Sequence, residues 1–143
     1  MNLRHVGITV KNLDLSKKFY CDLLGFKVHK EMEEKGEFID SISGLENVVV
    51  TTVKMFHPDS SSDGMIELLN YKSHNTETSR LDINNGGITH FALTVNDVVG
   101  IHQRLLKNNV QFNCKPLLSD DGGAIVTFCR DYEGNLIELV EIV

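Results

Sequence analysis

The sequence predicts an α+β fold made of two tandem βαβββ units that pair into a curved mixed sheet. An alternating apolar segment near the N-terminus is followed by a segment with helical periodicity, and the same plan begins again at Gly87. Each half then continues with further segments typical of strands. A single unit would leave strand edges unpaired and one sheet face open, so we expect the two units to share one sheet.

The first strand and helix are expected in the segment RHVGITVKNLDLSKKFYCDLLGFKV. Apolar residues alternate there with His5, Gly7 and Thr9, which therefore share one face of the strand. Asn12 or Asp14 can then cap a helix. Apolar side chains recur every four residues along that helix and predict one buried stripe, at Leu15, Phe19 and Leu23.

The second half repeats this plan in the segment GITHFALTVNDVVGIHQRLLKNNVQF. His90 aligns with His5 at the start of the expected strand. Asn96 or Asp97 again precedes a helical stripe, which consists of Val98, Ile101 and Leu105. The repetition indicates two copies of one structural unit.

The remaining strands complete each unit. In the first half we expect strands in VHKEMEEKGEFI, NVVVTTVKMF and MIELLNY, and in the second half in VQFN, AIVTFCR and NLIELVEIV. We interpret residues 1–143 as a single domain, with unit one at about 1–71, a polar connector at about 72–86 and unit two at about 87–143. The stretch HPDSSSDG reads as a polar hairpin loop.

Composition limits the function classes. The chain has 143 residues, a hydrophobic fraction of 41% and no apolar run near the roughly 18 residues of a membrane span. A net charge of −6 without a Lys/Arg cluster predicts neither a nucleic-acid nor a membrane partner. The N-terminus lacks a signal-peptide pattern. Three widely spaced cysteines fit unpaired packing residues, so we expect a cytoplasmic protein.

Both halves carry an early histidine and a glutamate in the middle of the last strand. The glutamates lie in the shared I-E-L core of MIELLNY and NLIELVE, and small residues neighbour both histidines on their faces. A single His or Glu is usually structural, but a recurring set favours metal binding. The predicted ligands are His5, Glu67, His90 and Glu138. Two imidazoles and two carboxylates without a thiolate suit one divalent Zn, Ni, Co, Mn or Fe ion, with two positions open for substrate oxygens.

These motifs together resemble the vicinal oxygen chelate superfamily, also called the glyoxalase, bleomycin-resistance and dioxygenase superfamily. The resemblance rests on HVGITVKNLDLSKKFYCDLLGFKV, IELLNY, THFALTV and RDYEGNLIELVE, and it covers nearly the whole chain. It implies a glyoxalase-like fold with a divalent metal in a cleft between the units. It also places the family's metal ligands on His5, Glu67, His90 and Glu138.

Within the family, the His/Glu/His/Glu pattern is similar to that of bacterial glyoxalase I, a lactoylglutathione lyase. Methylmalonyl-CoA epimerases usually carry Gln at the position of Glu67, and they keep an extra acid near the stretch KEMEEKGE. Bacterial glyoxalase I tends to have an Arg in its first strand where this chain has Thr9, which leaves the identity of the thiol open. Fosfomycin transferases, extradiol dioxygenases and bleomycin-binding members fit this ligand pattern less well.

The expected function is a metal-dependent lyase or isomerase that moves a proton next to a carbonyl of a small chelated substrate. Glu138, or less favourably Glu67, would carry the proton between adjacent carbons. The alternatives are a methylmalonyl-CoA epimerase-like isomerase and a non-catalytic protein that binds a small molecule or antibiotic. A homodimer is the expected assembly, with the site either within one chain or across the dimer.

Overall fold

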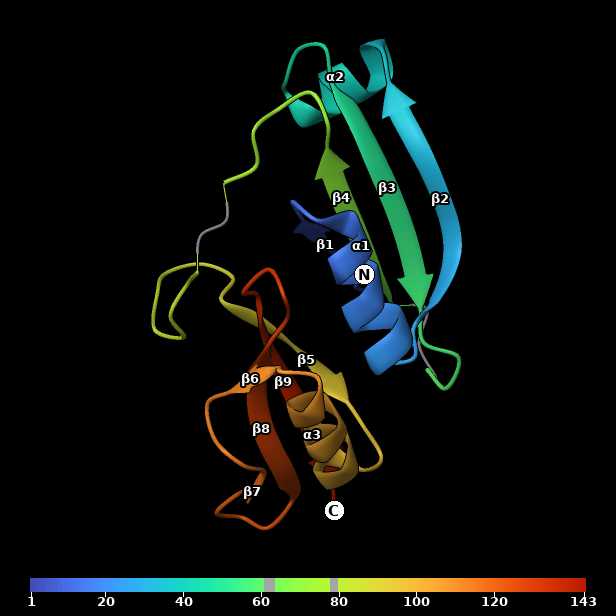
Figure 1. Ribbon diagram of the computed structural model, residues 1–143. Coiled ribbons are helices and arrows are strands. Elements are labelled where there is room, and N and C mark those ends of the chain that lie inside the picture. Colours follow the sequence, from blue (N-terminus) through green and yellow to red (C-terminus); the bar gives the residue numbers. More distant parts are fainter. Residues whose placement is uncertain (61–63, 78–79) are drawn as a thin grey trace. The chain divides into compact units, whose positions relative to one another are not determined.

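The computed structural model describes residues 1–60, 64–77 and 80–143. The chain forms two compact units, unit 1 at Met1–Thr78 and unit 2 at Ser79–Val143, which Figure 1 shows in blue to yellow-green and in yellow to red. The boundary between them falls inside the predicted connector. Residues 61–63 of the predicted hairpin loop and residues 78–79 of the predicted connector lie outside the described residues.

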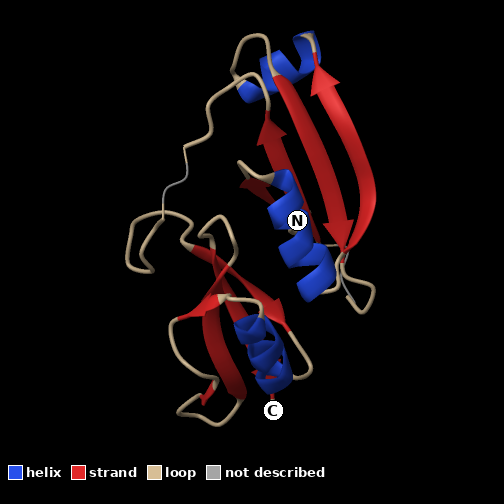
Figure 2. Cartoon of the chain, in the orientation of Figure 1, coloured by secondary structure: helices blue, strands red, loops and turns tan. Residues whose placement is uncertain are grey.

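Unit 1 contains one mixed four-stranded sheet with the strand order β1-β4-β3-β2. β1 pairs with β4 in parallel, whereas β4 with β3 and β3 with β2 are antiparallel (Figure 2). The elements are β1 (His5–Thr9), α1 (Leu13–Lys17), η1 (Lys18–Leu23), β2 (Lys27–Lys35), α2 (Glu37–Ser43), β3 (Val49–Phe56) and β4 (Met65–Tyr71).

The first helix begins where the sequence predicts. Asn12 is its N-cap, and the side-chain Oδ1 of Asn12 accepts a hydrogen bond of 3.0 Å from the backbone N–H of Leu15. The second half of the helix, η1, winds as π-helical turns, which apolar periodicity does not reveal. Gly25 ends it with a φ of 86°, a left-handed conformation that glycine adopts without steric cost.

The core of unit 1 lies between this helix and one face of the sheet. Phe19 and Tyr20 are fully buried and pack edge to face, with ring centroids 5.0 Å apart. Facing them, the sheet contributes apolar side chains that alternate with residues of the opposite face, namely Ile8, Val53, Met55, Ile66 and Leu68. Two of the three predicted stripe residues, Phe19 and Leu23, are buried, whereas Leu15 is exposed.

A second helix, α2, replaces part of a predicted strand. The sequence EFI reads as a continuation of β2, but Gly36 breaks the strand with a φ of 96° and the chain turns into α2. The Asp40 carboxylate then accepts hydrogen bonds from the backbone N–H groups of Asn47 and Val48, at 3.0 and 2.8 Å. Ile39 of α2 packs with Val48, Val50, Leu69 and Tyr71.

Unit 2 repeats the plan around a five-stranded sheet of its own, so the described strands form two mixed sheets rather than the one shared sheet expected from the sequence. Its main order is β5-β9-β8-β6, with β5 and β9 parallel and β7 paired to β8. The elements are β5 (His90–Thr94), α3 (Val98–Lys107), β6 (Gln111–Phe112), β7 (Leu117–Leu118), β8 (Ala124–Arg130) and β9 (Leu136–Ile142). The predicted VQFN strand is thus reduced to two residues, and β7 is an addition that the sequence does not predict.

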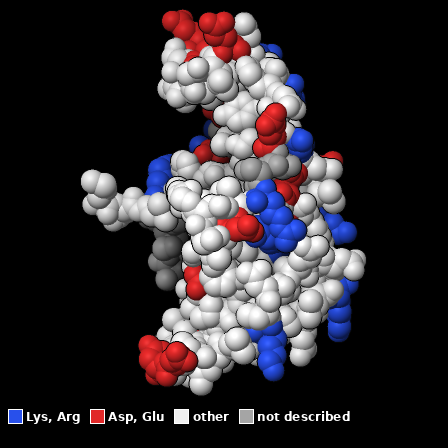
Figure 3. Space-filling model, turned by 90° about the vertical axis from the view of Figure 1, so that its left-hand side faces the viewer, with Lys and Arg blue, Asp and Glu red and all other residues white. Residues whose placement is uncertain are grey.

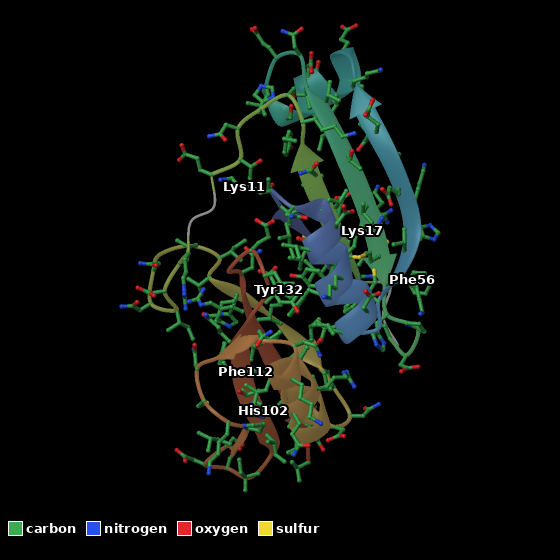
Figure 4. The ribbon with its side chains drawn as sticks, in the orientation of Figure 1. Lys11, Lys17, Phe56, His102, Phe112 and Tyr132 are labelled. Carbon is green, nitrogen blue, oxygen red and sulfur yellow. The ribbon has the colours of Figure 1, made fainter. Side chains whose placement is uncertain are left out.

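The helix of unit 2 is held by hydrogen bonds at its N-terminus and by a ring contact at its middle. Asp97 is its N-cap, with Oδ1 accepting a hydrogen bond of 2.8 Å from the N–H of Gly100. The N–H of Val98 donates to the Glu141 carboxylate of β9 at 2.8 Å. In the middle of α3, the ring of His102 packs against the ring of Phe112 with centroids 4.4 Å apart; both residues are labelled in Figure 4.

A buried turn sets the entry into β9. Asp131 is 5% exposed, and one of its carboxylate oxygens accepts backbone hydrogen bonds from Glu133 and Asn135 at 3.0 and 2.8 Å. The adjacent Arg130 guanidinium donates to the Gly134 carbonyl at 2.7 Å. The turn brings β8 and β9 together in antiparallel register, with Phe128 opposite Glu138.

None of the helices in the described ranges is both long enough and apolar enough to cross a membrane. On the face shown in Figure 3, acidic atoms form small groups and basic atoms are dispersed among uncharged ones. That face therefore has the mixed charge of an ordinary protein surface rather than a broad field of one sign.

Truncation of the β9 core should destabilise the protein. Leu139 is fully buried, so Leu139→Ala removes apolar contacts and leaves a cavity, at an expected cost of about 2–5 kcal/mol. Leu118, which is 60% exposed, offers a matched control, and Leu118→Ala should change the free energy of unfolding by about 0.5 kcal/mol or less. Urea unfolding of both variants measures the difference, and equal losses would contradict the described packing.

The three cysteines occupy different environments. Cys129 is buried, Cys21 is partly buried with its Sγ 3.6 Å from the Met55 Sδ, and Cys114 is exposed. Burial raises the pKa of Cys129 to about 12, with a smaller contribution from the negative charge of Asp131. Burial also raises the pKa of Cys21. The predicted packing role fits Cys129, whereas Cys114 lies at the surface.

Thiol labelling tests this assignment. Because the thiolate is the reactive form, a pKa of about 12 leaves only about one in ten thousand Cys129 side chains reactive at pH 8. We expect 5,5′-dithiobis(2-nitrobenzoate) to modify Cys114 rapidly in the folded protein and all three cysteines in denaturant. Cys114→Ser should remove the fast phase. Rapid modification of Cys129 in the folded wild type would show that the assignment is wrong.

Candidate metal centre

Parallel pairing of the first and last strands brings a histidine and a glutamate together in unit 1. Gly7 of β1 lies opposite Glu67 of β4, and His5 precedes Gly7 by two residues on the same strand face. The His5 Nε2 atom lies 3.0 Å from the Glu67 Oε2 atom. The Glu67 side chain is 12% exposed and that of His5 is 39% exposed, so the carboxylate is largely buried and the imidazole lies nearer the surface.

Unit 2 reproduces this register. Ala92 of β5 lies opposite Glu138 of β9, and His90 again precedes the paired residue by two positions. The His90 Nε2 atom is 3.6 Å from the Glu138 Oε2 atom. The other ring nitrogen, Nδ1, lies 3.1 Å from the Thr89 hydroxyl, and this contact leaves Nε2 directed at the carboxylate.

The side chains beside both histidines are small. Gly7 and Thr9 on β1 are exposed, and so are Ala92 and Thr94 on β5. On the opposite face of β1, Ile8 is buried and Val6 is partly buried. The side chains beside the two histidines on β1 and β5 are therefore small and exposed rather than packed.

The two pairs differ in what the third strand places beside them. In unit 1, β3 positions Lys54 opposite Glu67, and the Lys54 Nζ atom lies 3.4 Å from the Glu67 Oε1 atom. In unit 2, β8 positions Phe128 opposite Glu138, and the Phe128 ring packs edge to face on His90 at 5.2 Å. Sequence reasoning missed both neighbours, although a lone Lys in the apolar run VVTTVKMF was a visible signal.

The donor atoms of each pair suit a shared metal ion. Metal to nitrogen and metal to oxygen bonds of about 2.1 Å place two adjacent ligand atoms on one ion about 3.0 Å apart in octahedral and about 3.4 Å apart in tetrahedral geometry. The distances of 3.0 and 3.6 Å are close to these values. Within residues 1–60, 64–77 and 80–143, no three His, Cys, Asp or Glu side chains are assembled as a metal site. The predicted ligands thus lie in two pairs, one per unit.

One further acid in the described part of unit 1 lies on the same face of the sheet as Glu67. Glu34 of β2 lies opposite Val50, and the Thr52 hydroxyl donates to its carboxylate at 2.5 Å. Thr52 is opposite Leu69 of β4, so this pair lies one alternation away from Lys54 and Glu67 along β3. Of the other glutamates in KEMEEKGE, Glu31 pairs with Lys17 at 2.7 Å, Glu33 pairs with Lys72 at 2.9 Å, and Glu37 lies in α2.

Comparison with known proteins gives the family. The family model of the Glyoxalase/Bleomycin resistance protein/Dioxygenase superfamily matches residues 2–139. A probable lactoylglutathione lyase from Synechocystis sp. is 29% identical over 142 residues, covering 99% of this chain and 95% of that protein. A lactoylglutathione lyase from Neisseria meningitidis serogroup A is 26% identical over 144 residues and is matched over 91% of its length.

Solved structures share the fold. A glyoxalase family protein from Bacillus cereus superposes with a TM-score of 0.89 at 23% identity, over 100% of this chain and 95% of that one. The trypanothione-dependent glyoxalase I of Leishmania major superposes with a TM-score of 0.67 at 26% identity, over 99% and 86% of the two chains. With its two repeated units and a family match along nearly its whole length, the chain belongs to the glyoxalase/bleomycin resistance protein/dioxygenase superfamily.

Proposed function

We propose that this protein is a glyoxalase I-like lyase or isomerase that uses one divalent metal ion and moves a proton next to a carbonyl. The single observation that carries the proposal is the repeated His–Glu pair, His5 with Glu67 and His90 with Glu138, in the same strand register of two units. The similarity to lactoylglutathione lyases supports the reaction type.

The four residues of the two pairs would hold the ion. Their neutral imidazoles and carboxylates balance a divalent charge, and nitrogen and oxygen donors suit Zn, Ni, Co, Mn or Fe. When bound, the ion would act as a Lewis acid toward two neighbouring substrate oxygens and would stabilise negative charge that develops there. Small residues beside the histidines, such as Gly7 and Ala92, leave space for a ligand on those faces.

One of the two ligand glutamates would carry the proton. Glu138, with its side chain 24% exposed and its pair distance the longer of the two, is the better candidate for a group that leaves its partner during turnover. Its carboxylate would take the proton from the hydroxyl-bearing carbon of a hemithioacetal and return it to the adjacent carbonyl carbon. Glu67 is held by both His5 and Lys54, which favours a fixed ligand.

Residues of this chain also support two alternative functions. Glu34, on the same sheet face as Glu67, supplies an additional acid for a methylmalonyl-CoA epimerase-like isomerase. A non-catalytic protein that binds a small molecule or antibiotic would use the same strand faces without proton transfer.

Assays of hemithioacetal isomerisation and of acyl-CoA epimerisation with Ni²⁺, Co²⁺, Zn²⁺ and Mn²⁺ separate these functions. We also propose that the protein is cytoplasmic and forms a homodimer. Light scattering would measure the oligomeric state.

Metal uptake is the first test of the proposal. The wild type should bind about one Ni²⁺ or Co²⁺ per chain in calorimetric titration, and His5→Ala and His90→Ala should each weaken binding by at least about a hundredfold, because loss of a direct ligand exceeds loss of a supporting group. His29→Ala, at an exposed position of β2, is the matched control and should bind normally. A wild type that takes up no ion would overturn the proposed function.

A second test separates catalysis from metal binding. Glu138→Gln keeps an oxygen ligand but removes the basic carboxylate, so turnover of the hemithioacetal should fall by about a hundredfold or more while metal is partly retained. Glu46→Gln changes an exposed glutamate to the same residue and should leave turnover unchanged. Normal kcat in Glu138→Gln would exclude Glu138 as the base.

A further inference from the structure

Lys54 brings a positive charge to the carboxylate of the unit 1 pair. It comes from β3, and its place opposite Glu67 in the antiparallel ladder puts both side chains on one face of the sheet. The Lys54 Nζ atom lies 3.4 Å from the Glu67 Oε1 atom, whereas the Glu67 Oε2 atom lies 3.0 Å from the His5 Nε2 atom. The two oxygens of one carboxylate are therefore divided between a lysine and the candidate metal ligand His5.

Lys54 supplies the charge that Glu67 requires when no ion is bound. The Glu67 side chain is 12% exposed, and a largely buried carboxylate is destabilising unless a positive or hydrogen-bonding partner lies beside it. The Lys54 side chain is 30% exposed, so its ammonium group is itself partly withdrawn from water. The two groups compensate each other, and the unit 1 pair therefore does not depend on a metal ion for its charge balance.

The same ammonium group would compete with a metal ion. An ion held by His5 and the Oε2 atom of Glu67 carries two positive charges and would bind the carboxylate that Lys54 already contacts. Like charges repel at distances of a few ångströms. Lys54 also contacts Oε1, which opposes ligation of the ion by both carboxylate oxygens. Both effects lower the affinity for a divalent ion.

Charge rather than hydrogen bonding dominates this contact. Charge-assisted hydrogen bonds from an ammonium group to a carboxylate are typically about 2.7–2.9 Å long, and the distance between Lys54 and Glu67 is 3.4 Å. A partner that orients a ligating carboxylate through a short hydrogen bond usually strengthens metal binding. At 3.4 Å this orienting effect is weak, so the positive charge of Lys54 is the larger influence on a bound ion.

In unit 2 an uncharged residue takes the equivalent position. Phe128 of β8 lies opposite Glu138, and its ring packs on the ring of His90. The unit 2 pair thus has the same ligand types with an aromatic neighbour in place of the ammonium group. The competing charge is a feature of the unit 1 pair and not of the repeated plan.

We propose that Lys54 is a positioning residue that balances Glu67 in the metal-free protein and lowers the affinity of the unit 1 pair for a divalent ion. This inference rests on the proposed function, which supplies the ion, and it involves only atoms of unit 1. Removal of this neighbour of a metal ligand should therefore tighten metal binding. A variant that merely loses structure would bind the ion more weakly.

The experiment measures Co²⁺ affinity by calorimetric titration in the presence of a competing chelator. Lys54→Met removes the charge and keeps a side chain of similar length. We expect Lys54→Met to bind Co²⁺ at least tenfold more tightly than the wild type, which corresponds to about 1.4 kcal/mol. Lys54→Arg keeps the charge and should bind within threefold of the wild type. If Lys54→Met fails to fold, Lys54→Gln gives the same comparison with an uncharged polar side chain.

The control variant is Lys30→Met. Lys30 of β2 lies opposite Lys54 on the same sheet face but is exposed and one strand further from Glu67. It therefore reports the effect of losing a positive charge on this face without losing the charge at the carboxylate. Co²⁺ affinity in Lys30→Met should stay within threefold of the wild type. Circular dichroism of every variant verifies that each is folded.

The outcomes separate this inference from the proposed function. If the wild type binds Co²⁺ and Lys54→Met binds it less than tenfold more tightly, or more weakly, the role of Lys54 is overturned and the metal centre stands. Equal gains in Lys54→Met and either Lys54→Arg or Lys30→Met also overturn it. Uptake by Lys54→Met but not by the wild type would support the role of Lys54 and contradict the proposed function. Absence of uptake by both overturns both.

Discussion

Parallel pairing between the first and last strands of each unit is the constraint on which the candidate centre depends. A histidine near the start of one strand meets a glutamate in the middle of the other only because Gly7 lies opposite Glu67 and Ala92 opposite Glu138. A shift by one residue would send one member of each pair to the helix side of the sheet. The remaining strands and helices hold this register through burial and hairpin turns.

The two units keep the same pairs but surround them differently. A charged neighbour on β3, Lys54, contacts Glu67, whereas an aromatic neighbour on β8, Phe128, contacts His90. The same pair therefore has a charged neighbour in unit 1 and an aromatic neighbour in unit 2. Among the described salt bridges, Glu67 has two ion-pair neighbours, His5 and Lys54. Glu138 has one, His90. This asymmetry favours different roles for the two acids.

Much of the fold was predictable because its signals are local. Alternation located β1, β4, β5 and β9, and the caps at Asn12 and Asp97 are confirmed by their hydrogen bonds. The helix α2 was missed because it follows a strand pattern without a change of polarity, and only the positive φ of Gly36 marks the break. The π-helical turns of η1 were missed because their apolar positions resemble those of an α-helix.

The sequence by itself determined the duplicated βαβββ plan, the family and the four candidate ligands, because periodicity and repetition are properties of the chain. Only the tertiary structure decided which ligands are neighbours, since the contact between His5 and Glu67 joins strands some sixty residues apart through a register that no local pattern encodes. For the same reason, the contact between Lys54 and Glu67 depends on the register between β3 and β4.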